Sequence, residues 1–161
     1  EKEFDAESWL AGIRYLTERE TTYILEYYRN ETGFTTDEMR DYFSFINTAY
    51  DSYLTSGSDT LLKKGLSITE GNYGRLNPAR EYLYLRISQK EPFDILYFTP
   101  SITWISNISD KSFSLSPELL YTGITNLELR LKASFIDGAR LSEYGEKQND
   151  YRMEFRMRYY F

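Results

Sequence analysis

The chain contains no cysteine and no histidine. The absence of cysteine removes disulfide and thiolate chemistry. The absence of histidine excludes Ser-His hydrolysis, His-ligated metals and imidazole acid–base catalysis. Carboxylate pairs remain as candidate catalytic groups, but no pair stands out by its spacing. We therefore expect a protein that is not an enzyme, with no catalytic residue, no metal site and no cofactor.

Long apolar runs and basic tracts are missing as well. No run of eighteen apolar residues exists, so the sequence predicts no transmembrane helix. The opening stretch, EKEFDAESWLAG, lacks a basic segment followed by an apolar one, so a signal peptide is either absent or already removed. The formal net charge of −6 and the lack of a concentrated basic tract argue against a nucleic-acid partner.

Tyrosine is what the chain has in excess. It occurs 16 times in 161 residues, and aromatic residues make up 17% of a chain whose mean hydropathy is only −0.57. Tyrosine combines an apolar ring with a polar tip and favours wet apolar boundaries. The excess therefore fits the aromatic girdles of a membrane barrel better than a dry core.

The last eleven residues, 151–161, alternate strictly between apolar and charged side chains. The apolar set is Tyr151, Met153, Phe155, Met157, Tyr159 and Phe161, and the charged set is Arg152, Glu154, Arg156 and Arg158. In an extended chain the two sets lie on opposite faces. Strands of this kind, apolar outside and polar inside, are how a β-barrel spans an outer membrane.

This ending also resembles the C-terminal strand of bacterial outer-membrane β-barrel proteins of the porin-like kind, which closes on a terminal Phe after alternating aromatic or apolar residues. The resemblance implies that Tyr151, Phe155, Tyr159 and Phe161 form the signal recognised by the barrel assembly machinery. It also implies a location in the bacterial outer membrane, with lipid and lipopolysaccharide as partners. The resemblance is specific only over this strand, and no individual porin family follows from it.

Similar alternation recurs along the chain. Period-two patterns bounded by turn residues predict strands near 8–17, 21–30, 81–89, 95–106, 112–122, 126–136 and 151–161. Two prolines, Pro100 and Pro117, fall inside predicted strands. Because proline donates no hydrogen bond to a strand ladder, each requires a bulge or a locally missing hydrogen bond.

The segment 31–79 interrupts this pattern. Apolar residues with helical spacing predict an amphipathic helix near 36–55, which a T-x-x-E capping box at Thr35 and Glu38 begins and Gly57 ends. A second short helix is expected through Lys64, followed by irregular chain from Gly65 onward. The first helix is expected to pack on the segment itself, on a barrel mouth, or partly inside the lumen.

These elements predict an all-β fold, an antiparallel up-and-down transmembrane β-barrel with a long extracellular loop that contains the helix. Short and long connections largely alternate as such a barrel requires, although the link after the fourth strand is brief but polar, and residues 1–161 form one domain or the C-terminal part of one. The strand count is odd, whereas bacterial single-chain barrels have an even number. We therefore expect part of a larger barrel, completed by missing strands or by other chains.

The polar parity of the strands supplies the candidate functional residues. The expected lumen-lining residues are Arg14, Glu26, Arg86, Glu118, Glu128, Arg130, Lys132, Arg152, Glu154, Arg156 and Arg158. Positive charge prevails in this set, so a water-filled interior would weakly favour anions. An alternative is that these charges only form a cross-strand ladder that satisfies the wall.

Three functions remain open at this point. The first is an outer-membrane channel for passive diffusion or uptake of small solutes. The second is a structural barrel that sheathes or docks a partner protein, such as an electron-transfer cytochrome, because large barrels are often plugged. The third is a soluble β-sandwich or lipid-binding barrel, which would stay monodisperse without detergent.

Overall fold

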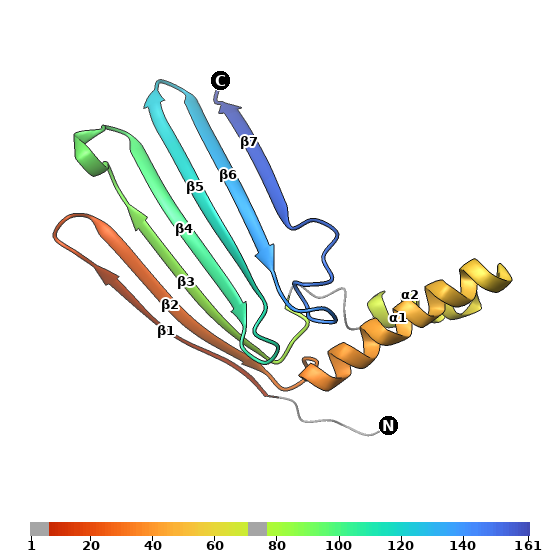
Figure 1. Ribbon diagram of the computed structural model, residues 1–161. Coiled ribbons are helices and arrows are strands. Elements are labelled where there is room, and N and C mark those ends of the chain that lie inside the picture. Colours follow the sequence, from red (N-terminus) through yellow and green to blue (C-terminus); the bar gives the residue numbers. More distant parts are fainter. Residues whose placement is uncertain (1–6, 71–76) are drawn as a thin grey trace.

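The computed structural model describes residues 7–70 and 77–161. These residues form one antiparallel sheet in which seven strands follow each other in chain order (Figure 1). The strands are β1 (Ser8–Leu16), β2 (Thr21–Asn30), β3 (Glu81–Gln89), β4 (Phe98–Asn107), β5 (Phe113–Ile124), β6 (Leu127–Asp137) and β7 (Tyr151–Tyr159). Two α-helices, α1 (Thr36–Ser56) and α2 (Thr60–Ile68), lie between β2 and β3. The predicted all-β, antiparallel arrangement of seven strands is confirmed.

Some predicted boundaries need correction. The fourth strand begins at Phe98 instead of residue 95, because the preceding chain forms the 3-10 turn η2 (Pro92–Asp94) with left-handed backbone at Phe93. The last strand ends at Tyr159, two residues before the expected end. The second helix continues past Lys64 to Ile68.

The expectation of irregular chain from Gly65 is wrong, because Gly65 is buried inside α2. Its role is close packing of the two helices: a Cβ atom there would lie 2.5 Å from Ile46 Cδ1 of α1. The glycine is therefore explained by helix contact and not by a turn. Gly71 and Gly74, which supported the same expectation, lie outside the described residues.

Both strand prolines are accommodated without a shift of register at their own positions. Pro100 pairs with β5 but lies just beyond the last pair between β3 and β4, Ser88 with Ser101. Pro117 pairs with β4, while the pairing of β5 with β6 is interrupted at Ser116 and Pro117 and then resumes in the same register. The locally missing pair that proline requires is thus present at Pro117.

The sheet does not close on itself within the described residues. Its outer strands, β1 and β7, each pair on one side only. A row of directly paired residues runs from Ile13, the sixth residue of β1, through Leu25, Leu85, Trp104, Leu115 and Phe135 to Tyr151, the first residue of β7. The strands are therefore strongly staggered, as strands that tilt around a barrel are.

Local sequence fixes the start and end of α1. Thr35 accepts a hydrogen bond from the Glu38 backbone N–H at 3.2 Å, and the Glu38 carboxylate accepts one from the Thr35 backbone N–H at 2.8 Å. This is the predicted capping box. Gly57 ends the helix in the left-handed conformation, at φ 72°. Figure 1 shows α1 and α2 leaving the end of the sheet where β2 stops and β3 starts, here called the helix end; the opposite end is the turn end.

Candidate functional site

The two faces of the sheet differ in chemistry and exposure. Leu119 is 42% exposed, whereas the side chain of its neighbour Glu118, on the other face, is only 14% exposed. On β7, Phe155 and Met157 are 67% and 65% exposed. The polar face is therefore the sheltered face, and the apolar face is open to the surroundings. A water-soluble sheet has the opposite arrangement.

All eleven predicted lumen residues lie on the polar face, which is sheltered on β2–β6, whereas Arg14 of β1 and the arginines of β7 are exposed. The strand registers connect them: Glu26 faces Gly12, Arg86 faces Ile24, Glu118 faces Lys132, and Glu128, Arg130 and Lys132 face Arg158, Arg156 and Glu154. Arg14 and Arg152 share the same parity on β1 and β7. The sequence thus predicted which side chains share a face, and the structure adds which of them touch.

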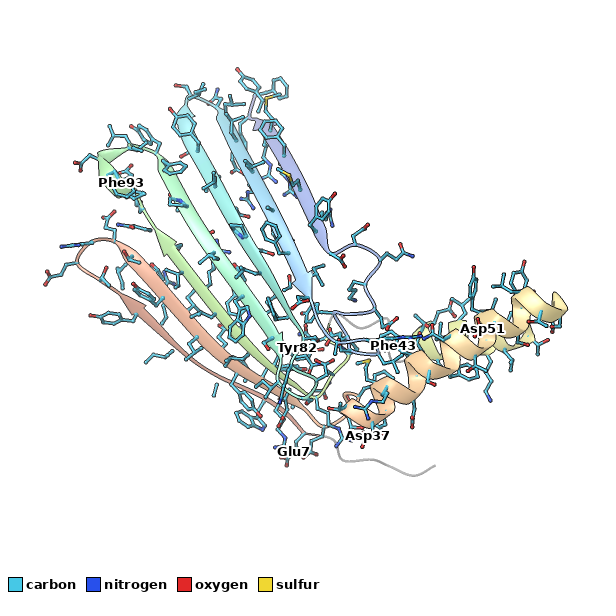
Figure 2. The ribbon with its side chains drawn as sticks, in the orientation of Figure 1. Glu7, Asp37, Phe43, Asp51, Tyr82 and Phe93 are labelled. Atoms are coloured by element: carbon cyan, nitrogen blue, oxygen red, sulfur yellow. The ribbon has the colours of Figure 1, made fainter. Side chains whose placement is uncertain are left out.

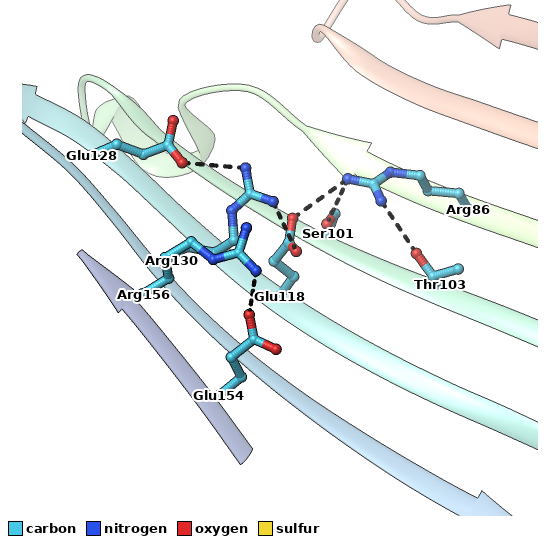
Figure 3. A network of polar contacts seen from close by, with 8 residues as sticks. All are labelled: Arg86, Ser101, Thr103, Glu118, Glu128, Arg130, Glu154 and Arg156. Carbon is cyan, nitrogen blue, oxygen red and sulfur yellow. Dashed lines mark hydrogen bonds and ion pairs between the residues drawn. The ribbon is translucent and has the colours of Figure 1, made fainter. Parts of the chain in front are cut away.

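Glu118 connects the centre of this face (Figure 3). Its carboxylate lies 3.7 Å from an Arg86 guanidinium nitrogen and 3.8 Å from one of Arg130. Arg130 also contacts Glu128 at 3.3 Å, while its Nε is buried and makes no hydrogen bond to the described residues. Arg86 donates further hydrogen bonds to Ser101 and Thr103 on β4. One carboxylate thus holds two guanidinium groups from β3 and β6.

A second group of ion pairs follows β7. Glu154 lies between Arg152, at 3.4 Å, and Arg156, at 2.7 Å. Arg156 stands directly opposite Arg130 in the register, a like-charge pair that would repel. Arg130 instead contacts Glu118 and Glu128, and Arg156 contacts Glu154. The ion pairs of Glu118 join different strands, whereas those of Glu128 and Glu154 join residues two apart on one strand, so within the described chain the cross-strand ladder expected as an alternative role is present only at Glu118.

Four of the eleven predicted residues stay outside these ion pairs. Arg14, Glu26 and Lys132 make no ion pair within 4.0 Å among the residues that the structure describes. Arg158 donates a hydrogen bond to the Tyr160 hydroxyl, which itself donates one to Glu128. The charges of β6 and β7 are thus partly compensated, and Lys132 contributes an uncompensated positive charge between Glu118 and Glu154 in the register.

The exposed apolar face carries aromatic side chains near both of its edges. The row near the turn end is Tyr15, Tyr23, Phe98, Tyr121 and Tyr159, and the row near the helix end is Trp9, Tyr27, Phe113, Phe135 and Tyr151. Aliphatic residues such as Ile13, Leu25 and Leu131 lie between the rows. Of the residues expected to form the assembly signal, Tyr151, Phe155 and Tyr159 lie on this face, and Phe161 follows the strand, fully exposed.

An apolar cluster covers the polar face at the helix end. Met39 and Phe43 of α1 pack with Ala79 and with Tyr82 of β3, and Tyr28 and Ile105 lie against them. The three strand residues of this cluster belong to the polar parity, since Tyr28 pairs with Tyr82 and Ile105 pairs with Tyr84. Figure 2 shows Phe43 and Tyr82 where α1 meets the sheet. The base of α1 is therefore seated on the sheltered side of the sheet, and we call these residues the cap.

A buried carboxylate joins the cap to the loop 138–150. Glu143 is 2% exposed, and its Oε2 accepts hydrogen bonds from the Tyr82 hydroxyl at 2.7 Å and the Asn107 side chain at 3.0 Å. The Glu143 backbone N–H donates to Asp110, which also accepts from Ser112. Burial raises the pKa of Glu143 above its ordinary value, although the two hydrogen bonds to its carboxylate oppose this.

Sequence reasoning does not single out this polar cluster. Glu143 is one carboxylate in a polar segment. It is buried only where the loop 138–150 meets Tyr82 of β3 and Asp110 of the turn after β4. The available signal is the pair of turn-forming residues Asn107 and Asp110, whose side chains each accept a hydrogen bond from the backbone N–H two residues further on. That pattern predicts an ordered turn but not its partner.

Comparisons with protein-family models, with curated proteins and with solved structures find no match to this chain. Neither helix between β2 and β3, nor any other helix in the described part of the chain, is long and apolar enough to cross a membrane. Within residues 7–70 and 77–161, no group of acidic side chains is arranged to hold a metal ion.

Proposed function

We propose that this chain forms part of the wall of an outer-membrane β-barrel that acts as a passive channel for small solutes, with an interior that weakly favours anions. The single observation that carries the proposal is the inverted exposure of the sheet, with the apolar face open and the charged face sheltered. Lipid is the surrounding that makes this arrangement favourable. In water the same apolar face would drive association.

The dimensions of the apolar face support this placement. The strands are 9 to 12 residues long, and a tilted transmembrane strand needs about 9–11 residues. Two aromatic rows flank an aliphatic band, which is the pattern of side chains at the two interfaces of a bilayer. The stagger from Ile13 to Tyr151 supplies the tilt.

Closure requires further strands. Strands alternate in direction along the sheet, so β1 and β7 run the same way. If they paired with each other, that seam would be parallel, whereas bacterial barrels close with antiparallel pairs. An odd number of additional strands would complete the barrel, from this protein or from another chain.

The polar face gives the interior its charge preference. Seven basic residues and four acidic residues share this face. The ion pairs at Glu118 and Glu154 fix the wall, while Lys132 and Arg14 remain without a partner within the described chain. A sheltered passage lined in this way concentrates anions.

Ion selectivity in a planar bilayer tests the proposal. In a salt gradient, the reversal potential of the complete barrel should show a weak anion preference. Arg156→Glu should move it towards cations, because the charge faces the interior; Lys132→Gln provides a milder change at a residue without an ion pair. The matched control is Lys63→Glu on α2, which changes the charge equally away from the sheet. A cation preference that Arg156→Glu leaves unchanged would contradict the anion-favouring interior.

A further inference from the structure

A second region of the polar face differs from the charged region of β5–β7. Next to the cap, β1–β4 and the chain before β3 enclose a pocket of about 400 Å³. It is lined by Leu10, Glu26, Tyr28, Asn77, Tyr82, Tyr84 and Ile105. This volume is within the range of sites for small molecules, and the lining is mostly apolar and aromatic with few polar groups.

The pocket shares Tyr28 and Tyr82 with the cap, and the contacts of the cap hold these two rings in place. The Tyr82 hydroxyl accepts a hydrogen bond from the Ala79 backbone N–H and donates one to Glu143, so its polar tip is already occupied. The Tyr28 ring lies 6.4 Å from the Tyr82 ring, centroid to centroid, and packs against the cap cluster. These rings present carbon surface to the pocket at little further cost in conformational entropy.

Glu26 is the charged residue of the pocket, and the space around it is a feature of the sequence. Gly12 stands opposite Glu26 on β1, and a Cβ atom at Gly12 would lie only 2.9 Å from Glu26 Cγ. Glycine thus leaves room for the glutamate side chain over β1. Tyr84 stands on the other side of Glu26 in the register.

Among the described residues, the Glu26 carboxylate has no ion-pair or side-chain hydrogen-bond partner. The other three predicted glutamates of this face, Glu118, Glu128 and Glu154, each contact an arginine. Glu26 makes no ion pair or side-chain hydrogen bond in the described chain, although Arg14 lies two residues from Gly12 on the same parity. A half-buried carboxylate among aromatic rings favours a cation that can meet both.

We propose that this pocket binds a small organic cation, an ammonium group with an apolar body, whose charge pairs with Glu26 and whose carbon atoms contact Tyr28, Tyr82 and Tyr84. The aromatic faces attract the cation through their quadrupoles, and Leu10 and Ile105 contact its apolar part. The site goes beyond the proposed function, because it would hold a cation locally although the charge of the whole polar face favours anions, and it rests on that function only for the claim that the pocket faces a lumen.

Choline and its neutral isostere 3,3-dimethylbutan-1-ol are the probes that test this site. Titration calorimetry on the full-length protein in detergent should show saturable choline binding, with the neutral isostere at least about tenfold weaker. Glu26→Gln should weaken choline binding to the level of the isostere. Glu128→Gln, which removes a carboxylate outside the pocket, should leave it unchanged.

Arg14→Gln tests whether the nearby positive charge opposes the bound cation. Removing this charge should leave choline binding equal or stronger, whereas loss of choline binding would show that the pocket depends on Arg14 and would overturn the proposal. Equal binding of the two probes would also overturn it, in favour of a neutral ligand, and so would no binding of choline. Because binding is measured without a bilayer, absence of conductance would contradict the proposed function and leave this result standing.

Discussion

Glu118 illustrates how single residues keep charge on a sheltered face. Its carboxylate is only 14% exposed and contacts guanidinium groups of two other strands. Partly buried ion pairs gain little net stability, but removing one partner leaves an uncompensated charge and is costly. The glutamates of this face are therefore expected to matter more for the order of the arginines than for the stability of the sheet. Selectivity depends on that order, because a disordered guanidinium no longer fixes the local potential.

The buried Glu143 predicts a pH dependence of the cap. Its pKa is raised above the ordinary value of 4.5 by burial, so the folded cap favours the protonated form. This contribution to stability is fully present below pH 4.5 and is lost as the pH rises through the raised pKa. Hydrogen exchange of the loop 138–150, corrected for intrinsic rates, should show protection that decreases over that pH range.

Glu143→Gln is the variant that isolates this effect. The amide retains an oxygen that accepts from Tyr82 and Asn107 but carries no charge, so protection should become nearly independent of pH. Asp150→Asn, an exposed change in the same loop, should keep the wild-type pH dependence. Protection that increases with pH in the wild-type protein would show that the carboxylate is stabilised when ionised.

At the scale of elements, the strands and the first helix could be predicted because their signals lie within their own local sequence. Each strand has a period of two, and α1 carries its own start and stop signals at Thr35 and Gly57, so these elements follow from sequence. The conformation of the turn at 90–97 does not follow from sequence, because Glu91, Phe93 and Tyr97 have left-handed backbone, which is uncommon for residues other than glycine.

For the candidate site, the sequence likewise predicted which residues share a face but not which of them contact each other. Parity alone assigned all eleven charged residues to one face, since a strand places alternate side chains on the same side. Parity could not tell that Glu26 has no ion-pair partner among the described residues or that Glu143 becomes buried. The space around Glu26 depends on Gly12 of the neighbouring strand, and the burial of Glu143 depends on contacts with Tyr82 and Asn107.

The helical segment predicts an effect on conductance. Met39 and Phe43 cover strand residues of the sheltered face, so α1 narrows the passage at the helix end if the sheet lines a lumen. Replacing residues 35–69 by a short Gly-Ser linker should therefore raise single-channel conductance. The change is measured in planar bilayers under symmetric salt.

A shortened segment provides the matched control. Replacing residues 47–63 by a short Gly-Ser linker removes the outer part of both helices, keeps Met39 and Phe43, and leaves a turn that lets Gly65 pack against Ile46. This variant should conduct like the wild-type protein. Equal conductance of all three proteins would mean that α1 packs at the sheet without narrowing the passage.

At the scale of the whole molecule, the chain lacks a core that could hold a soluble sandwich together. The buried apolar residues among the described ones are Met39, Phe43, Ala49, Ala79 and Tyr82, all in the cap or in α1. The large apolar face of the sheet has no second layer against it in Figure 1. Lipid around this face, as the proposed function requires, would supply the apolar burial that is the dominant favourable term in folding.

Strand β6 offers the most direct test of that medium, because it is paired on both sides and the protein has no native cysteine. Single cysteines at Leu129, Leu131 and Ala133 carry a spin label to the apolar face, and those at Glu128, Arg130 and Lys132 carry it to the polar face. In lipid bilayers the first set should collide with oxygen and the second with a water-soluble nickel chelate, so accessibility should alternate with period two. Ala133 and Lys132 are adjacent and provide the closest matched pair. Water accessibility at all six positions, in protein that stays monodisperse without detergent, would exclude the membrane wall and leave the soluble fold.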